Sequence, residues 1–392
     1  MTEVAQDAAA AGRHYADAAR NRAMKAEDRW HQLRLRLARR RRQNVTVLSM
    51  VGYGTQHWVR VFSRVVMAPD SHFVNGRRVT KLIADGFRGW RNFISAPVPF
   101  AEVTITAGGR TFDVVADRGG IVDTVIAVEL EPGWRRVTLQ ADGAQPAAAD
   151  VRIIADAART GVVCDVDDTV VVTRLPRPLL AAWNSFVLDE HARTPTPGIA
   201  VMMERLMGRF PQAPVLYLST GAWNVAQTLT RFLTRNLYPR GPLLLTDWGP
   251  TDERWFRSGA EHKVAELERL AVDFPEMSWL LIGDDGQHDP SIYADFARRH
   301  PQNVRAVIIR QLTYSEAMLA GGRASDPDAE SLLGGVDERE DAARGTGGSG
   351  DDVGRSGELA GGQRVGGRRI PWIYGPDGKD IVAKLERHGL LS

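Results

Sequence analysis

The sequence predicts an α/β fold in two parts, a small antiparallel β-sandwich followed by a parallel β-sheet with helices. Residues 45–155 contain short runs in which apolar and polar residues alternate, separated by Gly and Asp turns, as in half-buried antiparallel strands. Residues 159–320 instead alternate continuous apolar runs with helical patterns, which is typical of a parallel sheet. The length of 392 residues exceeds that of a typical single domain and favours two folded units with tails.

The segments outside these two units differ in composition. Residues 1–44 predict a helical arm with Trp30, Leu33 and Leu37 on one face, surrounded by arginines at positions 34, 36, 39, 40, 41 and 42. Residues 321–370 are rich in Gly, Ser and Asp and predict a disordered low-complexity linker. Residues 371–392 regain apolar spacing and predict a short ordered C-terminal segment.

The basic amphipathic arm allows two interpretations. It could lie on an anionic membrane surface, where each cation near the lipid contributes about 1 kcal/mol. It could equally pack on the protein's own body or against a helix of a partner. The sequence leaves both open, and it does not predict an oligomeric state.

Composition restricts the class of protein. The hydrophobic fraction of 43% is that of a globular chain, and no run approaches the roughly 20 apolar residues of a membrane span. The single cysteine, Cys164, excludes a disulfide within the chain and is expected to be a buried thiol in a reducing compartment. No Cys/His cluster has the spacing of a zinc site. We therefore expect a cytoplasmic protein, with peripheral membrane contact if the arm binds lipid.

The stretch that says most about chemistry follows the apolar run Gly161-Val162-Val163-Cys164. It reads Asp165-Val166-Asp167-Asp168-Thr169, so carboxylates stand where a buried strand ends, which is the edge at which open α/β folds bind ligands. Asp165 could attack phosphorus, and Asp167 could serve as general acid and then general base. Such acids need a divalent cation beside an anionic substrate. The alternative is an acidic loop that only caps the next helix.

Three downstream segments favour the chemical interpretation. Val215–Leu218 ends in Ser219, Trp279–Ile282 ends in Gly283-Asp284, and Lys263 precedes a helical pattern. Taken singly, Ser219 could be a helix N-cap, Lys263 a solvated charge, and Asp284 and Asp289 turn formers. Because these segments occur in order and mostly at strand ends, we expect one shared site.

In this order the DxDxT motif at 165–169, Ser219, Lys263 and the GDxxxxD motif from Gly283 to Asp289 resemble the haloacid-dehalogenase-type phosphotransferases. The string Gly283-Asp284-Asp285-Gly286-Gln287-His288-Asp289-Pro290 looks more specifically like the actin-patch-associated phosphatidate phosphatase family. The resemblance extends over about residues 45–315. It departs at Ser219-Thr220-Gly221-Ala222-Trp223, where Asn and a Ser-Pro pair are expected after the serine.

The resemblance implies a haloacid-dehalogenase-like Rossmannoid sheet with a minimal cap over residues 159–320. It also implies an Mg²⁺-dependent phosphatase that forms an aspartyl phosphate and converts phosphatidate, or a related lipid phosphate, to the dephosphorylated lipid. The implied catalytic residues are Asp165, Asp167, Ser219 and Lys263. The implied metal ligands are the Asp165 carboxylate, the Asp167 backbone carbonyl and Asp284, with Asp289 and Asp285 supporting them. The short interval between Thr169 and Ser219 predicts an open site, which suits a phosphate displayed on a lipid or a macromolecule.

Two other functions remain open from the sequence. The enzyme could act on phosphorylated nucleic-acid ends or on phosphoproteins, because an open site and a basic arm fit those substrates too, although nucleic acid is the less favoured partner. Alternatively, the chain could be a catalytically silent interaction protein. Clustered carboxylates repel one another, and a silent domain has no physical need to keep them.

Overall fold

The computed structural model describes residues 36–38, 40, 43–68, 95–172, 194–246, 252–286, 288–313, 316, 362–365 and 368–391. The chain divides into two compact units, Met1–Val151 and Arg152–Ser392. Of the predicted arm, residues 36–38 and 40 are helical, Gln43 and Asn44 are described with Asn44 beginning the first strand, and the rest lies outside the described residues, as does most of the predicted linker. None of the helices in the described part of the chain is long and apolar enough to cross a bilayer.

The first unit is built of antiparallel strands. They are β1 (Asn44–Ser49), β2 (Gly52–Gly54), β3 (Trp58–Ala68), β4 (Ala96–Pro97), β5 (Glu102–Ala107), β6 (Arg110–Val115), β7 (Ile121–Ala127), β8 (Gly133–Ala141) and β9 (Ala147–Ile153). Hydrogen bonds join them into one nine-stranded sheet in which β3 pairs antiparallel with β1, β2, β4 and β7. β5 lies between β6 and β8, antiparallel to both.

Alternation of side chains explains the core of this unit. Along β5, Val103 and Ile105 are buried while Glu102 and Thr106 are exposed, as expected for a strand with one face in a core. In β8, Val137 and Leu139 alternate with exposed polar residues in the same way. The alternating runs seen in the sequence therefore form strands, and their packing as a sandwich stays a prediction.

The second unit carries a seven-stranded sheet in the order β14-β13-β10-β15-β16-β18-β17. Its strands are β10 (Thr160–Asp165), β13 (Val215–Ala222), β14 (Leu243–Thr246), β15 (Ser278–Asp284), β16 (Val304–Arg310), β17 (Gly362–Val365) and β18 (Arg368–Gly375). All neighbours are parallel except β17 and β18. The predicted α/β class with a parallel sheet is thus confirmed. A short antiparallel pair, β11 (Val171–Val172) with β12 (Thr194–Pro195), follows β10.

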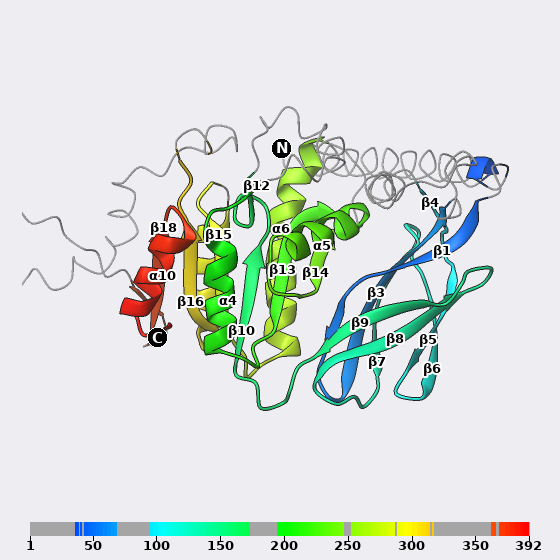
Figure 1. The fold of residues 1–392 in the computed structure, drawn as a ribbon, viewed down its shortest axis with the longest axis horizontal. Coiled ribbons are helices and arrows are strands. Elements are labelled where there is room, and N and C mark those ends of the chain that lie inside the picture. The colour runs from blue at the N-terminus through cyan, green and yellow to red at the C-terminus, as the bar shows by residue number, and fades with distance from the viewer. Residues whose placement is uncertain are drawn as a thin grey trace, which may run out of the picture. The chain divides into compact units, whose positions relative to one another are not determined.

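Helices connect the parallel strands (Figure 1). They are α4 (Ile199–Arg209), α5 (Ala226–Arg235), α6 (Asp252–Asp273), α7 (Asp289–Arg299) and α10 (Gly378–Arg387), with single-turn helices η2 (Trp223–Val225) and η3 (Pro301–Asn303). The strands between them are buried along nearly their whole length, which explains their continuous apolar runs. The chain runs from β10 outward to β14 and then returns to β15 on the other side of β10. This reversal is where doubly wound sheets bind ligands.

The C-terminal segment belongs to this sheet. β18 pairs in parallel with β16, with Ile308 beside Ile373 and Arg310 beside Gly375. α10 packs on α4, where the Gly378 amide donates to the Pro197 carbonyl and a Cβ on Gly378 would lie 2.1 Å from the Gly198 backbone. The predicted α/β segment ends at residue 320 and a disordered linker is predicted for residues 321–370, whereas β17 and the start of β18 lie within that predicted linker and extend the sheet.

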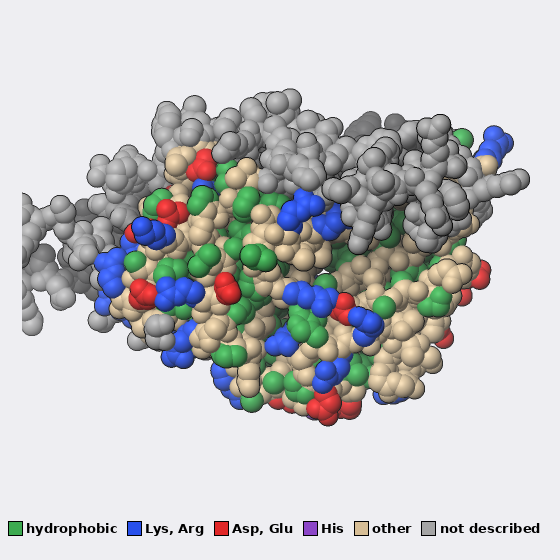
Figure 2. Space-filling view, viewed as in Figure 1, with side chains coloured by type: hydrophobic (Ala, Val, Ile, Leu, Met, Phe, Trp, Pro, Cys, Tyr) green, Lys and Arg blue, Asp and Glu red, His purple; other side chains and the backbone are tan. Residues whose placement is uncertain are grey.

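The surface mixes charges of both signs. On the face shown in Figure 2, positive and negative side chains of the described residues are interspersed with apolar ones. This arrangement differs from that at the carboxyl ends of the parallel strands, where charged side chains are buried together.

Candidate active site

The predicted site residues of the parallel sheet meet at one edge. Asp165 is the last residue of β10 and Asp284 is the last of β15, and the two strands pair directly, with Cys164 beside Ile282. Ser219 lies on β13, one residue past the position that pairs with Asp165. Lys263 comes from α6 and Asp289 opens α7. Parallel strands bring their carboxyl ends to the same side, so residues far apart in sequence share this edge.

Lys263 forms the electrostatic centre of the site. Its Nζ lies 2.6 Å from Asp165 Oδ1 and 2.5 Å from Asp289 Oδ1. The lysine is 6% exposed, and both carboxylates are buried. The alternative that Lys263 is a solvated charge is therefore wrong, because a buried ammonium needs the two carboxylates it contacts.

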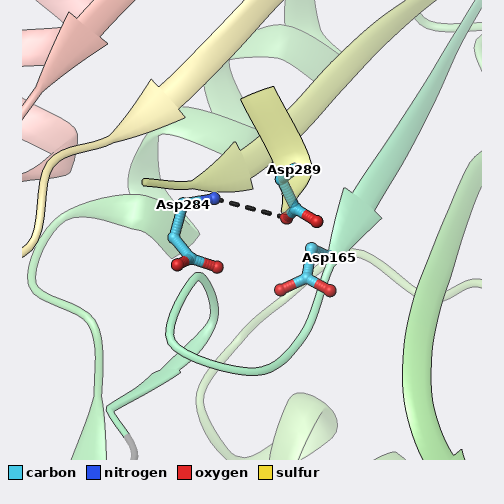
Figure 3. A group of neighbouring side chains, drawn as sticks. All are labelled: Asp165, Asp284 and Asp289. Atoms are coloured by element: carbon cyan, nitrogen blue, oxygen red, sulfur yellow. Dashed lines mark hydrogen bonds between the residues drawn. The ribbon is translucent and has the colours of Figure 1, made fainter. Parts of the chain in front are cut away.

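Asp284 is hydrogen-bonded to Asp289 and to Thr169, which lies in the loop that follows β10. The Asp284 amide donates to Asp289 Oδ2 at 3.4 Å, and Thr169 Oγ1 donates to Asp284 Oδ2 at 3.5 Å. Asp284 Oδ1 accepts from the Gly286 amide at 2.7 Å, so this aspartate also shapes the turn that follows β15. Figure 3 shows the side chains of Asp165, Asp284 and Asp289 directed toward a common space.

Asp167 and Ser219 form a second, adjoining pair. Ser219 Oγ donates to Asp167 Oδ2 at 3.0 Å and accepts from the Gly221 amide at 3.0 Å. Asp167 is partly exposed, unlike Asp165, which is completely buried. The structure thus separates the two acids of the motif by environment, because Asp165 is buried and Asp167 is partly exposed.

Asp285 points away from this group. Its Oδ1 accepts from the Leu312 amide at 2.8 Å, and its own amide donates to the Arg310 carbonyl at 3.0 Å. The side chain therefore ties the turn after β15 to the end of β16. Of the two predicted supporting aspartates, Asp289 contacts Lys263 and Asp285 braces the neighbouring strand.

A metal ion could be held by three of these carboxylates. Asp165, Asp284 and Asp289 each offer an oxygen, these oxygens lie within 4.8 Å of one another, and all three residues are buried. Asp165 Oδ2 is buried and has no hydrogen-bond donor, although its Oδ1 faces Lys263. An oxygen-only set with an unsatisfied buried carboxylate fits a hard divalent cation.

The same crowding shifts pKa values. Burial raises the pKa of Asp165 and outweighs the opposing attraction of Lys263, and the nearby carboxylates raise the pKa further, well above its ordinary range. Burial and the Asp289 carboxylate also hold the pKa of Asp284 well above its ordinary range. Burial by itself lowers the pKa of Lys263, but the attraction of Asp165 and Asp289 outweighs burial and raises it. The site holds more negative charge than one lysine balances, which favours a bound cation.

Arg310 escaped the sequence analysis. It ends β16, is 3% exposed, and its Nη1 donates to the backbone carbonyl of Asp168 at 2.6 Å. The signal is present in the sequence, because Ala306–Ile309 is an apolar run followed by a charged residue, as are the runs before Asp165 and Asp284. The signal that predicts Asp165 and Asp284 as site residues, a charged residue at the end of a buried strand, therefore applies to Arg310 as well.

The fold and the site together define a mixed α/β domain whose sheet edge presents buried carboxylates, a lysine and a hydroxyl, as phosphoryl-transfer hydrolases require. Residues 160–311 match the family model described as "Phosphatidate phosphatase APP1, catalytic domain". The predicted resemblance is thereby confirmed for this segment, which is similar to the catalytic domain of that phosphatase family. The match covers less than half of the 392 residues.

Two curated relatives are similar over the same region. "Phosphatidate phosphatase APP1" of Saccharomyces cerevisiae is 23% identical over 151 residues, which are 38% of this chain and 25% of the yeast protein. "Uncharacterized protein C29B5.04c" of Schizosaccharomyces pombe is 26% identical over 160 residues, with 38% and 25% covered. The chain thus spans about a quarter of the length of the curated relatives it matches.

Among solved structures, a carbohydrate acetylesterase from Xanthomonas citri aligns with a TM-score of 0.26 and 10% sequence identity, covering 71% of this chain and 73% of the esterase. A score this low carries no argument about fold or activity. The resemblance predicted for residues 45–159 stays a prediction.

Proposed function

We propose that this protein is an Mg²⁺-dependent phosphatase that hydrolyses a lipid phosphomonoester, phosphatidate or a close relative, through an aspartyl phosphate. The observation that carries the proposal is the environment of Asp165: a buried carboxylate at a strand end, paired with Lys263 at 2.6 Å and facing Asp284 and Asp289. It lies within the segment that matches the phosphatase catalytic domain.

The chain's own residues supply the covalent steps. The Asp165 carboxylate attacks phosphorus and forms an acyl phosphate, while the bond from phosphorus to the alkoxide breaks and Asp167 gives its proton to that oxygen. Asp167 then takes a proton from water as the water attacks phosphorus. This releases inorganic phosphate and regenerates Asp165.

Charge balance assigns the remaining roles. Lys263 stays protonated because its pKa is raised, so it neutralises Asp165 before attack and the phosphoryl oxygens afterwards. Mg²⁺, held by Asp165, Asp284 and the Asp167 backbone carbonyl, would offset the negative charge of substrate and carboxylates. Ser219 would donate to a phosphoryl oxygen, turning its hydroxyl from Asp167 toward the substrate.

The finer features of the fold belong to the same proposal. A haloacid-dehalogenase-like sheet is supported by the central place of β10, with Ser219 on one neighbouring strand and Asp284 on the other. The minimal cap was predicted from an interval whose residues 173–193 lie outside the described part of the chain. We further propose a cytoplasmic enzyme whose N-terminal arm contacts anionic lipid, and an antiparallel unit that closes as a sandwich.

The experiment is a phosphate-release panel with the full chain. Its substrates are phosphatidate in mixed micelles, a 5′-phosphorylated oligonucleotide, a phosphopeptide and a sugar phosphate, each with Mg²⁺ or with excess EDTA. We expect release from phosphatidate only, and only with Mg²⁺. Release from the oligonucleotide or the phosphopeptide alone would replace the substrate class, full activity in EDTA would remove the metal, and no release anywhere would favour the silent interaction protein.

The arm is tested separately. Deletion of residues 1–44 should weaken binding to vesicles that contain anionic phosphatidylserine, and the binding of the full chain should fade with added salt. Hydrolysis of a short-chain soluble substrate should hardly change, because every site residue lies outside the arm. Equal vesicle binding by both proteins would show that the arm does not attach the enzyme to lipid.

A further inference from the structure

Arg310 is a buried cation that the proposed chemistry does not use. Its guanidinium bridges two partners: Nη1 donates to the Asp168 carbonyl at 2.6 Å, and Nη2 lies 2.8 Å from Glu316 Oε1. The Arg310 side chain is 4% exposed and that of Glu316 is 19% exposed. A buried guanidinium must be stabilised by the groups that it contacts, which here are the Asp168 carbonyl and the Glu316 carboxylate.

The bond to Asp168 falls at a distinctive point of the backbone. Asp168 has a φ of 59°, a left-handed conformation that residues other than glycine rarely adopt. It stands between Asp167 and Thr169 in the loop that turns back on itself, where the Val170 and Val171 amides both donate to the Val166 carbonyl at 3.0 Å. Arg310 holds the carbonyl at the turning point of this loop.

Glu316 is itself fixed in place. Its Oε2 accepts from the Thr313 amide and from Thr313 Oγ1, each at 3.0 Å, while the Glu316 amide donates to Thr313 Oγ1 at 3.3 Å. This reciprocal arrangement is a capping box. Although burial by itself raises the pKa of Glu316, the bonds from Thr313 and Arg310 lower it, so the side chain is ionised. Glu316 also lies beyond the segment that matches the phosphatase family.

We propose that Arg310, oriented by Glu316, is a positioning residue for the loop that carries the two motif aspartates. By holding the Asp168 carbonyl it sets where the neighbouring Asp167 carboxyl lies relative to Asp165. Arg310 does not touch the reacting atoms and acts through Asp168. The kinetic consequence rests on the proposed function, whereas the consequence for the loop does not.

A positioning role makes a prediction that a purely structural ion pair does not. Loss of Arg310 displaces the general acid more than the nucleophile, because Asp165 is also held by Lys263 and by its strand. An alkyl phosphate needs the acid to protonate its leaving alkoxide. p-Nitrophenyl phosphate releases a weakly basic phenolate and needs it far less.

The test compares Arg310→Met with a matched control on the same strand, Arg305→Met. Arg305 lies toward the other end of β16, where its Nη1 donates to Thr160 Oγ1 and its guanidinium stacks on Phe210. We expect Arg310→Met to lower kcat/KM, which reports the steps up to departure of the leaving group, by about 10²-fold for the alkyl phosphate and by clearly less for the aryl phosphate. Arg305→Met should lower neither rate more than slightly.

A second measurement does not depend on activity. Hydrogen exchange of the Val170 and Val171 amides in the metal-free protein should speed up in Arg310→Met and keep its rate in Arg305→Met, while exchange in β15 stays slow in both. If the wild-type protein releases phosphate from no substrate, the proposed function fails, and this measurement alone decides the role of Arg310.

Glu316→Gln serves where Arg310→Met does not fold. It keeps the shape and removes the charge, so it should shift the kinetics and the loop exchange in the same direction by a smaller factor. The proposal is overturned if the folded variant that is measured matches Arg305→Met in loop exchange. It is also overturned if kcat/KM falls equally for the alkyl and the aryl phosphate in an otherwise active enzyme.

Discussion

The two sheets of this protein treat charge in opposite ways. In the antiparallel unit, the ion pairs Arg60–Asp123 and Arg136–Asp150 lie on strand faces with solvent access, and the buried polar residues among those described are Ser63 and Ser95. In the parallel unit, charged residues are buried near the carboxyl ends of the strands: Asp165, Asp168, Lys263, Asp284, Asp289 and Arg310.

The difference shows where function overrides stability. A buried carboxylate loses its hydration and is expensive unless paired, whereas an exposed ion pair costs little and contributes little. A fold that needed only stability would keep its acids at the surface, as the antiparallel sheet does. The buried cluster therefore identifies a site, and the contrast between the units can be measured.

The largest expected effect is that of Asp165→Asn on turnover. Phosphate release should fall to background because an amide cannot act as the nucleophile. The thermal midpoint of the metal-free protein should stay equal or rise, because one of several repelling carboxylates is gone. Asp123→Asn in the other sheet is the control and should keep full activity. Substantial release by Asp165→Asn would remove Asp165 from its role.

Next in size is the effect of Lys263→Met on stability. The substitution keeps an unbranched side chain but leaves Asp165 and Asp289 without their cation, and breaking a buried pair costs about 3–5 kcal/mol. Urea denaturation in EDTA should show this loss in the free energy of unfolding. A loss below about 1 kcal/mol, the size typical of an exposed pair, would erase the contrast between the two sheets.

The pH dependence of stability gives a smaller effect with a definite sign. The folded-state pKa values of Asp165 and Asp284 are raised, so the folded protein binds protons that the unfolded chain has released above about pH 4. Metal-free stability should therefore fall as pH rises from 4 toward those raised values. Asp165→Asn should flatten the fall, and Mg²⁺ should abolish it.

The titration of His262 changes the free energy of unfolding with pH in the opposite direction, over a limited pH range. Burial lowers the pKa of His262 to about 4, so the fold gains stability from this group as pH rises from about 4 to about 6.5. The carboxylate effect is therefore read above about pH 4 as the difference between wild type and Asp165→Asn, in which the contribution of His262 cancels. A wild-type stability in EDTA that rises over this range, with no change on substitution, would contradict the buried-charge account.

The smallest expected effect lies in the antiparallel sheet. Arg60 Nε and Nη2 donate to the two Asp123 oxygens at 2.6 and 2.7 Å, but the aspartate side chain is 34% exposed. Asp123→Asn should lower the free energy of unfolding by about 1 kcal/mol or less, and less still at high salt. A cost comparable to that of Lys263→Met would mean that both sheets depend equally on ion pairs.

The sequence by itself determined which polar residues stand at the carboxyl ends of the parallel strands. Continuous apolar runs mark strands buried on both faces, and whatever polar residue follows such a run must emerge at the end of the strand. Asp165, Ser219 and Asp284 could therefore be assigned to one edge before any coordinates were known. The alternating runs of the first unit located strands such as β5 and β8 for an equally local reason, their period of two.

Only the tertiary structure decided which residues meet. The apolar periodicity of its helix does not predict that Lys263 is buried between two carboxylates, because lysine is not one of the apolar residues that define a buried face. The sequence of β18 does not predict that this strand pairs with β16, because a long segment separates the two strands in the chain. Arg310 reaches the Asp168 carbonyl, 142 residues away in sequence, only through the register of β16, which strand pairing sets and no local pattern contains.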